Sequence, residues 1–195
     1  LLPSSTKEGY IFDGWYTEIN EGKRIESDSI VTIASNDTLY AHWVLANYTI
    51  TYHLDSGIND EDNPPTYTIE TATIALQEAT KEGYTFDGWY DNASFSGTAI
   101  THIAIGSTGN KSLYAKWTPI TYTITYSVNG GINDEDNPPT YTIETATIAL
   151  EEATKEGYTF IGWYDNAEFT GSAVTHITVG STGNRTLYAK WTPTI

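Results

Sequence analysis

An eight-residue motif that returns at a fixed interval constrains this sequence more than any other feature. Gly83–Tyr90 reads Gly-Tyr-Thr-Phe-Asp-Gly-Trp-Tyr, and the motif recurs with one substitution each at Gly9–Tyr16 and Gly157–Tyr164. Successive copies begin 74 residues apart. Self-similarity at a constant period indicates an array built from one folding unit. The fold and the function of this chain therefore have to be those of an array.

The period divides the chain into three parts. Residues 48–121 and 122–195 match at 58 of 74 positions, and no insertion is needed to align them. We predict an incomplete first repeat with its linker at residues 1–47, a complete second repeat at 48–121 and a complete third repeat at 122–195. Because the chain starts within a repeat, we expect it to be part of a longer protein.

Aromatic residues have to supply the cores of these small units. A unit of about 74 residues is near the lower limit for an independent hydrophobic core. The chain has no cysteine, so it has neither disulfides nor thiolate metal ligands. It does have 15 Tyr and 6 Trp, and each of these side chains can bury a large area. We therefore predict small domains stabilised by aromatic packing.

Four segments of each complete repeat have the pattern of β-strands. In the second repeat, Tyr48–Leu54 alternates apolar and polar residues, which is typical of a half-buried strand. Thr66–Leu76 also reads as a strand, but its alternation changes phase near Thr71, which predicts a bulge or a break into two short strands. The other two strands are predicted at Tyr84–Tyr90 and Lys111–Trp117.

We predict almost no helix in this chain. We expect one helical turn at most, in Gln77–Gly83, where the glycine would end it. No amphipathic stretch of a dozen residues is present elsewhere. The predicted fold class is therefore mainly β, α+β at most, in tandem small domains with little helix.

The motif itself predicts a bulge. Strict alternation along Tyr84–Tyr90 would place Phe86 and Trp89 on opposite faces of the sheet. A bulge at Asp87-Gly88 would bring both rings to one face, and glycine is a common residue at bulges. We therefore expect an irregular strand here.

The charge of the chain excludes some partners. The formal net charge is −16 at pH 7, and nucleic acids and anionic membranes attract basic surfaces. We therefore expect no nucleic-acid partner. No run of about 18 apolar residues is present, so we expect no membrane insertion. The first residues, Leu1-Leu2-Pro3, do not resemble a signal peptide.

The motif and the closing segment together resemble a known family. Lys81–Tyr90, followed by Leu113-Tyr114-Ala115-Lys116-Trp117, is similar to the Listeria–Bacteroides repeat, also called the internalin B-type B-repeat. The resemblance covers all three repeats. It implies a β-grasp-like fold, an extracellular bacterial multidomain protein and no catalytic residues. It also implies core positions at the matched residues, namely Tyr84, Phe86, Trp89, Leu113 and Trp117, with their counterparts 74 residues away.

The incomplete first repeat departs from the family pattern. A β-grasp pairs its first and last strands side by side, and residues 1–43 lack the first strand. The closing segment Leu39–Trp43 would then present an open sheet edge, and unpaired edges favour pairing with another chain. We expect residues 1–43 either to be loosely held or to be completed by strand exchange with a partner.

Few residues of the sequence are candidates for a catalytic or metal site. The four histidines stand in no catalytic or zinc-binding motif, so we expect no enzyme and no cofactor. The acidic turns 59–63 and 133–137 contain the calcium candidates Asp60, Asp62, Asp134 and Asp136. Calcium binds oxygen ligands on flexible loops, but this spacing does not fit an EF-hand. A solvated acidic turn is the alternative, and we favour it.

Two tyrosines are candidates for ligand contact. Tyr114 and Tyr188 lie between the predicted core positions of the closing strands and should point outward. Exposed aromatic rings can stack on sugars, whereas the alternative for most aromatics of this chain is core packing.

Two functions are compatible with these observations. The first is an extracellular stalk or spacer, without catalysis, in an adhesin-like protein of a bacterial cell surface or a secreted protein. Near-identical copies favour it, because duplicates add length without adding specificity. The second is a module that binds a host surface protein or a glycan, with repeated copies acting by avidity.

Overall fold

The computed structural model describes residues 2–26 and 37–195. Contacts divide the chain into two compact units, Leu1–Thr80 with Phe86–Lys116 and Lys81–Thr85 with Trp117–Ile195. The described residues form β-strands and no helix, which confirms the mainly β fold class. The strands are β1 Tyr10–Tyr16, β2 Tyr40–Leu45, β3 Tyr48–His53, β4 Thr66–Tyr67, β5 Ile74–Ala75, β6 Tyr84–Tyr90, β7 His102–Ile103, β8 Lys111–Pro119, β9 Tyr122–Ser127, β10 Thr140–Tyr141, β11 Ile148–Ala149, β12 Tyr158–Tyr164, β13 His176–Ile177 and β14 Arg185–Pro193.

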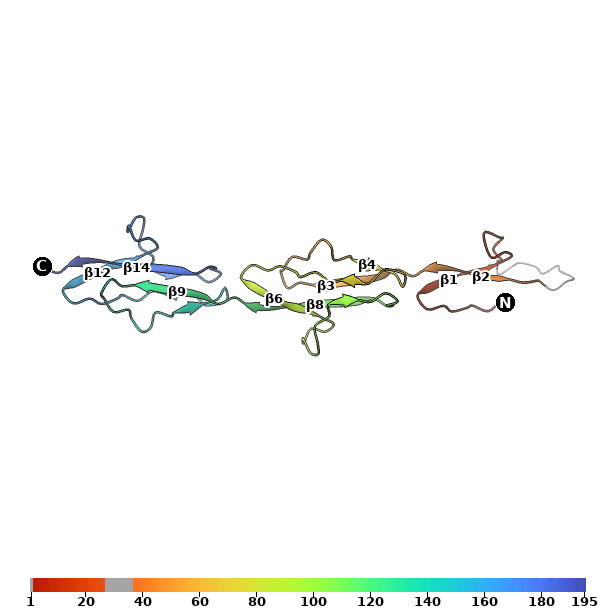
Figure 1. Ribbon diagram of the computed structural model, residues 1–195, viewed down its shortest axis with the longest axis horizontal. Coiled ribbons are helices and arrows are strands. Elements are labelled where there is room, and N and C mark those ends of the chain that lie inside the picture. Colours follow the sequence, from red (N-terminus) through yellow and green to blue (C-terminus); the bar gives the residue numbers. More distant parts are fainter. Residues whose placement is uncertain (1, 27–36) are drawn as a thin grey trace. The chain divides into compact units, whose positions relative to one another are not determined.

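The main sheet of the third repeat has the strand order β10-β9-β14-β12. Strands β9 and β14 run parallel, with Ile124 opposite Arg185 and Ser127 opposite Tyr188 (Figure 1). Strands β10 and β12 pair antiparallel on either side. The second repeat has the same order, β4-β3-β8-β6, and again a parallel central pair. The first and last strands of each complete repeat are thus parallel neighbours, as the family resemblance implied.

The predicted break near Thr71 is confirmed. Strand β4 ends at Tyr67, and a tight turn follows in which the Thr71 amide donates to the Thr68 carbonyl at 3.0 Å. Strand β5 then pairs with β7 in a separate two-stranded sheet, where Ile74 lies opposite Ile103. The third repeat builds the same small sheet from β11 and β13.

The helical turn expected at Gln77–Gly83 is wrong. Residues 77–80 are instead held at two points by an earlier loop, and a tight turn follows in which the Tyr84 amide donates to the Lys81 carbonyl at 3.1 Å. The Gln77 amide donates to Asn63 Oδ1 at 2.8 Å. Thr80 and Ile58 exchange backbone hydrogen bonds of 2.7 and 2.9 Å. These partners lie 14 or more residues away in the sequence, so the local pattern of Gln77–Gly83 could not indicate them.

The predicted bulge of the motif is confirmed. In the third repeat the register between β12 and β14 shifts between Phe160 and Gly162. The ring centroids of Phe160 and Trp163 then lie 5.4 Å apart on one face. Gly162 has a φ of 152°, and a Cβ there would lie 2.8 Å from the Cβ of Ala173. Glycine is therefore required both by the backbone and by the close approach of the neighbouring loop.

The core of the third repeat surrounds Trp163, whose side chain is 1% exposed. Its indole nitrogen donates to the Glu151 carbonyl at 2.8 Å, and the Tyr126 ring packs edge-on against it at 5.2 Å. Aromatic rings prefer such edge-to-face contacts, which stabilise beyond their buried area. The other buried residues of this core are Ile124, Tyr141, Ala153, Ile177, Leu187 and Ala189.

The first repeat has a smaller sheet. Strands β1 and β2 pair antiparallel, and among the described residues neither pairs with a further strand, although Tyr16 makes one antiparallel bridge to Arg24. Trp15 stands at the position of Trp163 but is only half-buried. Its indole nitrogen donates to the Pro3 carbonyl at 2.7 Å. The partner strand and the tyrosine that enclose Trp163 have no counterpart here, so the same motif is less completely packed.

Alkaline pH should destabilise the complete repeats through two half-buried tyrosines. Burial raises the pKa of Tyr52 and of Tyr126 from 10.0 to about 12. A raised pKa means that folding favours the neutral phenol, so the stabilisation is full below pH 10 and is lost as the pH rises toward 12. We expect the free energy of unfolding to fall in this window, and to fall less steeply in Tyr126→Phe, as measured by urea denaturation. Parallel pH profiles for the two proteins would contradict this assignment.

Candidate functional site

The motif tryptophans belong to the core and do not line a cleft. Trp89 and Trp163 are each 1% exposed. Leu113 is also buried, and Phe86 is half-buried with its ring centroid 5.3 Å from that of Trp89. Trp117 is half-buried. A ligand could not reach the central indole rings without unfolding the repeat.

Tyr84 is an exception among the implied core positions. Its side chain is half-buried, and its hydroxyl donates to Glu144 Oε1 at 2.8 Å. The equivalent Tyr10 bonds to Glu70, whereas Tyr158 is exposed. The core role implied for this tyrosine is therefore wrong, because it contacts a residue of another repeat and lies outside the packed interior of its own.

A buried asparagine organises each acidic turn. Asn137 is 5% exposed, and its side-chain nitrogen donates to Asn133 Oδ1 at 2.9 Å and to the Glu151 carbonyl at 3.0 Å. Its oxygen accepts from the Glu151 amide at 2.8 Å. The Glu151 backbone carbonyl also accepts from the Trp163 indole nitrogen, so this one carbonyl links the turn to the core. Asn63 makes the same contacts in the second repeat.

From the sequence, this asparagine was predicted only to be part of a polar turn. Asn63 and Asn137 both stand immediately before two prolines, a context that indicates a turn. Their identity in both copies does not single them out, because all residues of 57–76 recur unchanged in 131–150. One sequence cannot show which loop residues are buried.

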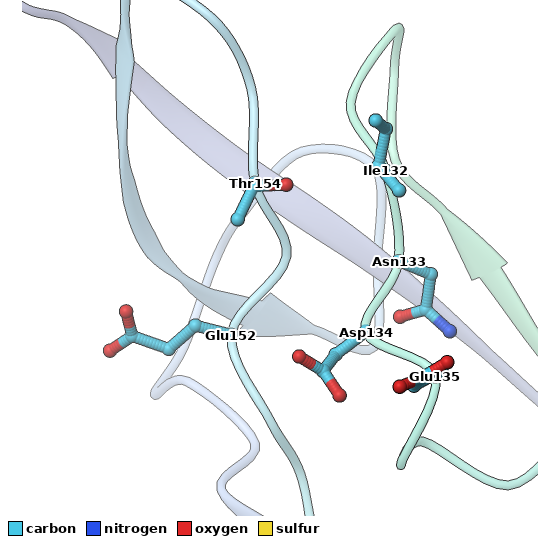
Figure 2. Close-up of a pocket in the computed structure, with 6 residues that line it drawn as sticks. All are labelled: Ile132, Asn133, Asp134, Glu135, Glu152 and Thr154. Atoms are coloured by element: carbon cyan, nitrogen blue, oxygen red, sulfur yellow. The ribbon is translucent and has the colours of Figure 1, made fainter.

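The acidic turn of the third repeat borders a shallow cleft. Figure 2 shows its lining, with Asp134 and Glu135 on one segment and Glu152 on the neighbouring segment. Backbone hydrogen bonds between Ile132 and Thr154 join the two segments. Ile132 is exposed, so the cleft combines three carboxylates with an apolar edge. The surface there is strongly acidic and open to solvent.

The calcium candidates do not gather into a ligand cage. Asp134 Oδ1 accepts from the backbone amide of Asp136 at 2.9 Å, and Asp60 does the same for Asp62. This bond fixes the turn and occupies one candidate ligand atom of each pair. In the described part of the chain, no group of three or more His, Asp or Glu side chains could hold a metal ion. The solvated acidic turn stays our preferred prediction, and calcium binding stays its alternative.

Tyr114 and Tyr188 lie on the outward face of the closing strands but are only half-exposed. The ring of Tyr114 stacks on that of His53, with centroids 4.1 Å apart and planes 7° apart. Ser127 stands opposite Tyr188 in the parallel ladder, where the second repeat has His53. The stacking face of Tyr114 is thus occupied by a histidine, whereas Tyr188 faces a small residue. A role of either tyrosine in binding a ligand stays a prediction.

A cluster of aromatic and basic side chains covers the same face. Lys190 Nζ lies 5.0 Å from the ring centroid of Tyr164 and 5.8 Å from that of Phe169. The Tyr164 and Phe169 rings contact edge-on at 5.7 Å. Phe169 has a φ of 56°, a conformation that is uncommon for a bulky residue. Phe95 repeats this at 52° in the second repeat, so the strained loop is a built feature of both.

The histidines contact side chains close to them. The ring of His176 bonds to the hydroxyl of Thr175 at 2.9 Å, and His102 bonds to Thr101 in the same way. His42 stacks on Tyr16 at 3.8 Å. Among the described residues no helix is long and apolar enough to cross a membrane.

Comparisons with known proteins agree with the repeat pattern. A sequence model of the Listeria-Bacteroides repeat domain matches three times, at residues 1–42, 48–116 and 122–190. A protein of Evansella cellulosilytica named "Putative membrane protein" is 31% identical over 193 residues, 95% of this chain and 27% of that protein. Internalin H of Listeria monocytogenes is 33% identical over 144 residues, 73% of this chain and 23% of internalin H. The chain spans about a quarter of the length of these relatives.

Proposed function

The chain belongs to the Listeria-Bacteroides repeat domain family, and on this premise we propose that it is a non-catalytic spacer in a bacterial cell-surface protein. The observation that carries the proposal is the parallel pairing of the first and last strands of a repeat. Because the first and last strands run in the same direction, the chain enters the sheet at one end and leaves it at the other. Each repeat therefore carries the chain onward by the length of its sheet.

The added length can be estimated from one strand. Strand β14 has nine residues, from Arg185 to Pro193. At about 3.3 Å per residue, nine residues span roughly 30 Å. Near-identical repeats of this kind increase reach while adding no new binding surface. An extracellular location fits the family and the acidic composition, and Internalin H is one of the relatives.

Small-angle X-ray scattering tests the spacer proposal. The 195-residue chain would be compared with a version that carries one more copy of residues 122–195 after Ile195. We expect the maximum dimension to increase by roughly 30 Å, the length of one nine-residue strand, with an unchanged cross-sectional radius. An increase below about 10 Å would mean that the added repeat folds back on the chain, and would contradict a spacer.

A binding function is the second candidate, and the strained loop residues Phe95 and Phe169 favour it. Side chains held in uncommon backbone conformations cluster at recognition sites. Both phenylalanines lie beside a tyrosine, and Lys190 is near Phe169. A glycan array and host-cell binding, measured for the chain and for the double variant Phe95→Ser and Phe169→Ser, test this. Binding that the double variant abolishes would replace the spacer proposal.

A further inference from the structure

The first two copies of the motif are each covered by a turn of another repeat. In the first compact unit, a Cβ on Gly9 would lie 2.6 Å from the Cβ of Ile69, so this isoleucine packs directly on the glycine. The adjacent Tyr10 hydroxyl donates to Glu70. Gly9 is buried in consequence. One apolar contact and one hydrogen bond to a carboxylate therefore define this joint.

The second compact unit repeats the same joint. It includes Lys81–Thr85 together with the third repeat. A Cβ on Gly83 would lie 2.7 Å from Ile143 Cδ1, and Tyr84 donates to Glu144 at 2.8 Å. Gly83 is again buried. The recurrence 74 residues later shows that this contact is a property of the repeat.

The turn that makes the contact is rigid. It has the sequence Thr-Ile-Glu-Thr at 68–71 and at 142–145. In the third repeat the Thr142 amide donates to Thr145 Oγ1 at 2.8 Å, and the Thr145 amide donates back to the Thr142 carbonyl at 3.1 Å. The Gly180 amide holds the Ile143 carbonyl at 3.0 Å. The isoleucine and glutamate at its tip are thus presented in a fixed geometry, which lowers the entropy lost on docking.

The third copy of the motif has the same local geometry but is exposed. The Thr194 amide donates to the Gly157 carbonyl at 2.9 Å, as Ile120 does to Gly83. Lys155 Nζ lies 4.3 Å from the Tyr158 ring centroid, the same distance as between Lys81 and Tyr84. Apart from Gly157 and its chain neighbours, no atom of the described residues lies within 4 Å of a Cβ on Gly157, and the Tyr158 side chain is 41% exposed.

We propose that Gly157 and Tyr158 form a docking surface for the Thr-Ile-Glu-Thr turn of a further copy of this repeat. Glycine is needed because any Cβ would occupy the place of the isoleucine. The Tyr158 hydroxyl supplies the hydrogen-bond donor for the glutamate, and Lys155 adds positive charge beside it. The proposal concerns a contact surface and is independent of the spacer function.

Tyrosine nitration tests the proposal in a chain extended after Ile195 by a copy of residues 48–121, which carries the same turn but whose peptides differ from those around Tyr158 and Tyr188. Exposed phenols react with tetranitromethane, and peptide mapping by mass spectrometry reads each tyrosine. We expect Tyr158 to react at least fivefold more slowly in the extended chain, while Tyr188 serves as the internal reference. Changing the isoleucine of the added turn to Asp and its glutamate to Lys should restore the rate. An unchanged rate at Tyr158 beside a folded added repeat would overturn the proposal.

A second measurement uses the 195-residue chain and needs no added repeat. Ile143→Asp should raise the nitration rate of Tyr84 to that of Tyr158, because it removes the isoleucine that covers Gly83. The matched control is Val179→Asp, an exposed position of the same repeat, which should leave Tyr84 unchanged. If Ile143→Asp also leaves the nitration rate of Tyr84 unchanged, the turn does not cover the motif and the proposed docking surface is refuted.

Discussion

Replacing Trp163 with alanine is expected to lower the free energy of unfolding of the third repeat by about 3–5 kcal/mol, the usual cost of removing a buried tryptophan. The indole is 1% exposed and packs between Tyr126 and Phe160. Its loss also leaves the Glu151 carbonyl without one of its donors. A domain of this size has a total stability of roughly 4–11 kcal/mol at 0.05–0.15 kcal/mol per residue, so the variant should be partly unfolded at 37 °C.

The first repeat provides a matched control for this substitution. Trp15 occupies the same motif position but is only half-buried, because the strand and the tyrosine that enclose Trp163 have no counterpart there. We expect Trp15→Ala to cost less than half as much. Urea denaturation followed by NMR measures both variants, with the peak intensities read from the repeat that carries the substitution. Equal losses, or a loss below about 1 kcal/mol for Trp163→Ala, would contradict the aromatic core described here.

The strands and the bulge could be predicted from the sequence because both depend on residues that are close together in the chain. The alternation in Tyr48–Leu54 depends on which face of one strand is buried. The bulge at Asp87-Gly88 follows from two large rings three positions apart with a glycine between them. Both features can be read within a window of eight residues.

The features that sequence reasoning missed depend on distant partners. Residues 77–80 do not form a helical turn because Asn63 and Ile58 hold them. The Tyr84 hydroxyl donates to Glu144, 60 residues later in the chain, and does not pack in the core. The docking surface was invisible for the same reason: Gly157-Tyr158 has the same residues as the covered copies, and only the structure shows that it is exposed.

Asn137 should be as important for stability as the core residues, although it lies in a polar turn. Asn137→Ala removes the three hydrogen bonds of a buried side chain and leaves the Glu151 amide and Asn133 Oδ1 without these partners. At about 1 kcal/mol for each hydrogen bond of a buried side chain, we expect a total loss of about 3 kcal/mol. Chemical denaturation at neutral pH measures this loss. The asparagine thus acts as a clamp between the acidic turn and the tryptophan core.

Asn166 is the matched control, because it makes a similar number of bonds at the surface. Its side chain caps an exposed loop through Asp165 and Thr170, at distances of 2.8–3.1 Å. Water can replace these partners, so Asn166→Ala should cost about 1 kcal/mol, the net contribution of ordinary hydrogen bonds. Similar losses at both positions would show that burial of Asn137 contributes nothing special.

A negative charge at position 137 tests whether the hydrogen bonds of Asn137 matter or only the shape of its side chain. Asn137→Asp keeps the oxygen that accepts from Glu151 but replaces the donor nitrogen with a second acceptor, in a buried site beside Asn133. Burial should raise the pKa of the new carboxyl above its unfolded value, so the penalty is largest at neutral pH and shrinks as the pH falls below that raised pKa. We therefore expect Asn137→Asp to be less stable than Asn137→Ala at pH 7 and to recover part of the difference near pH 4. If the order of the two variants does not depend on pH, the side chain is not held in a buried, donor-dependent clamp.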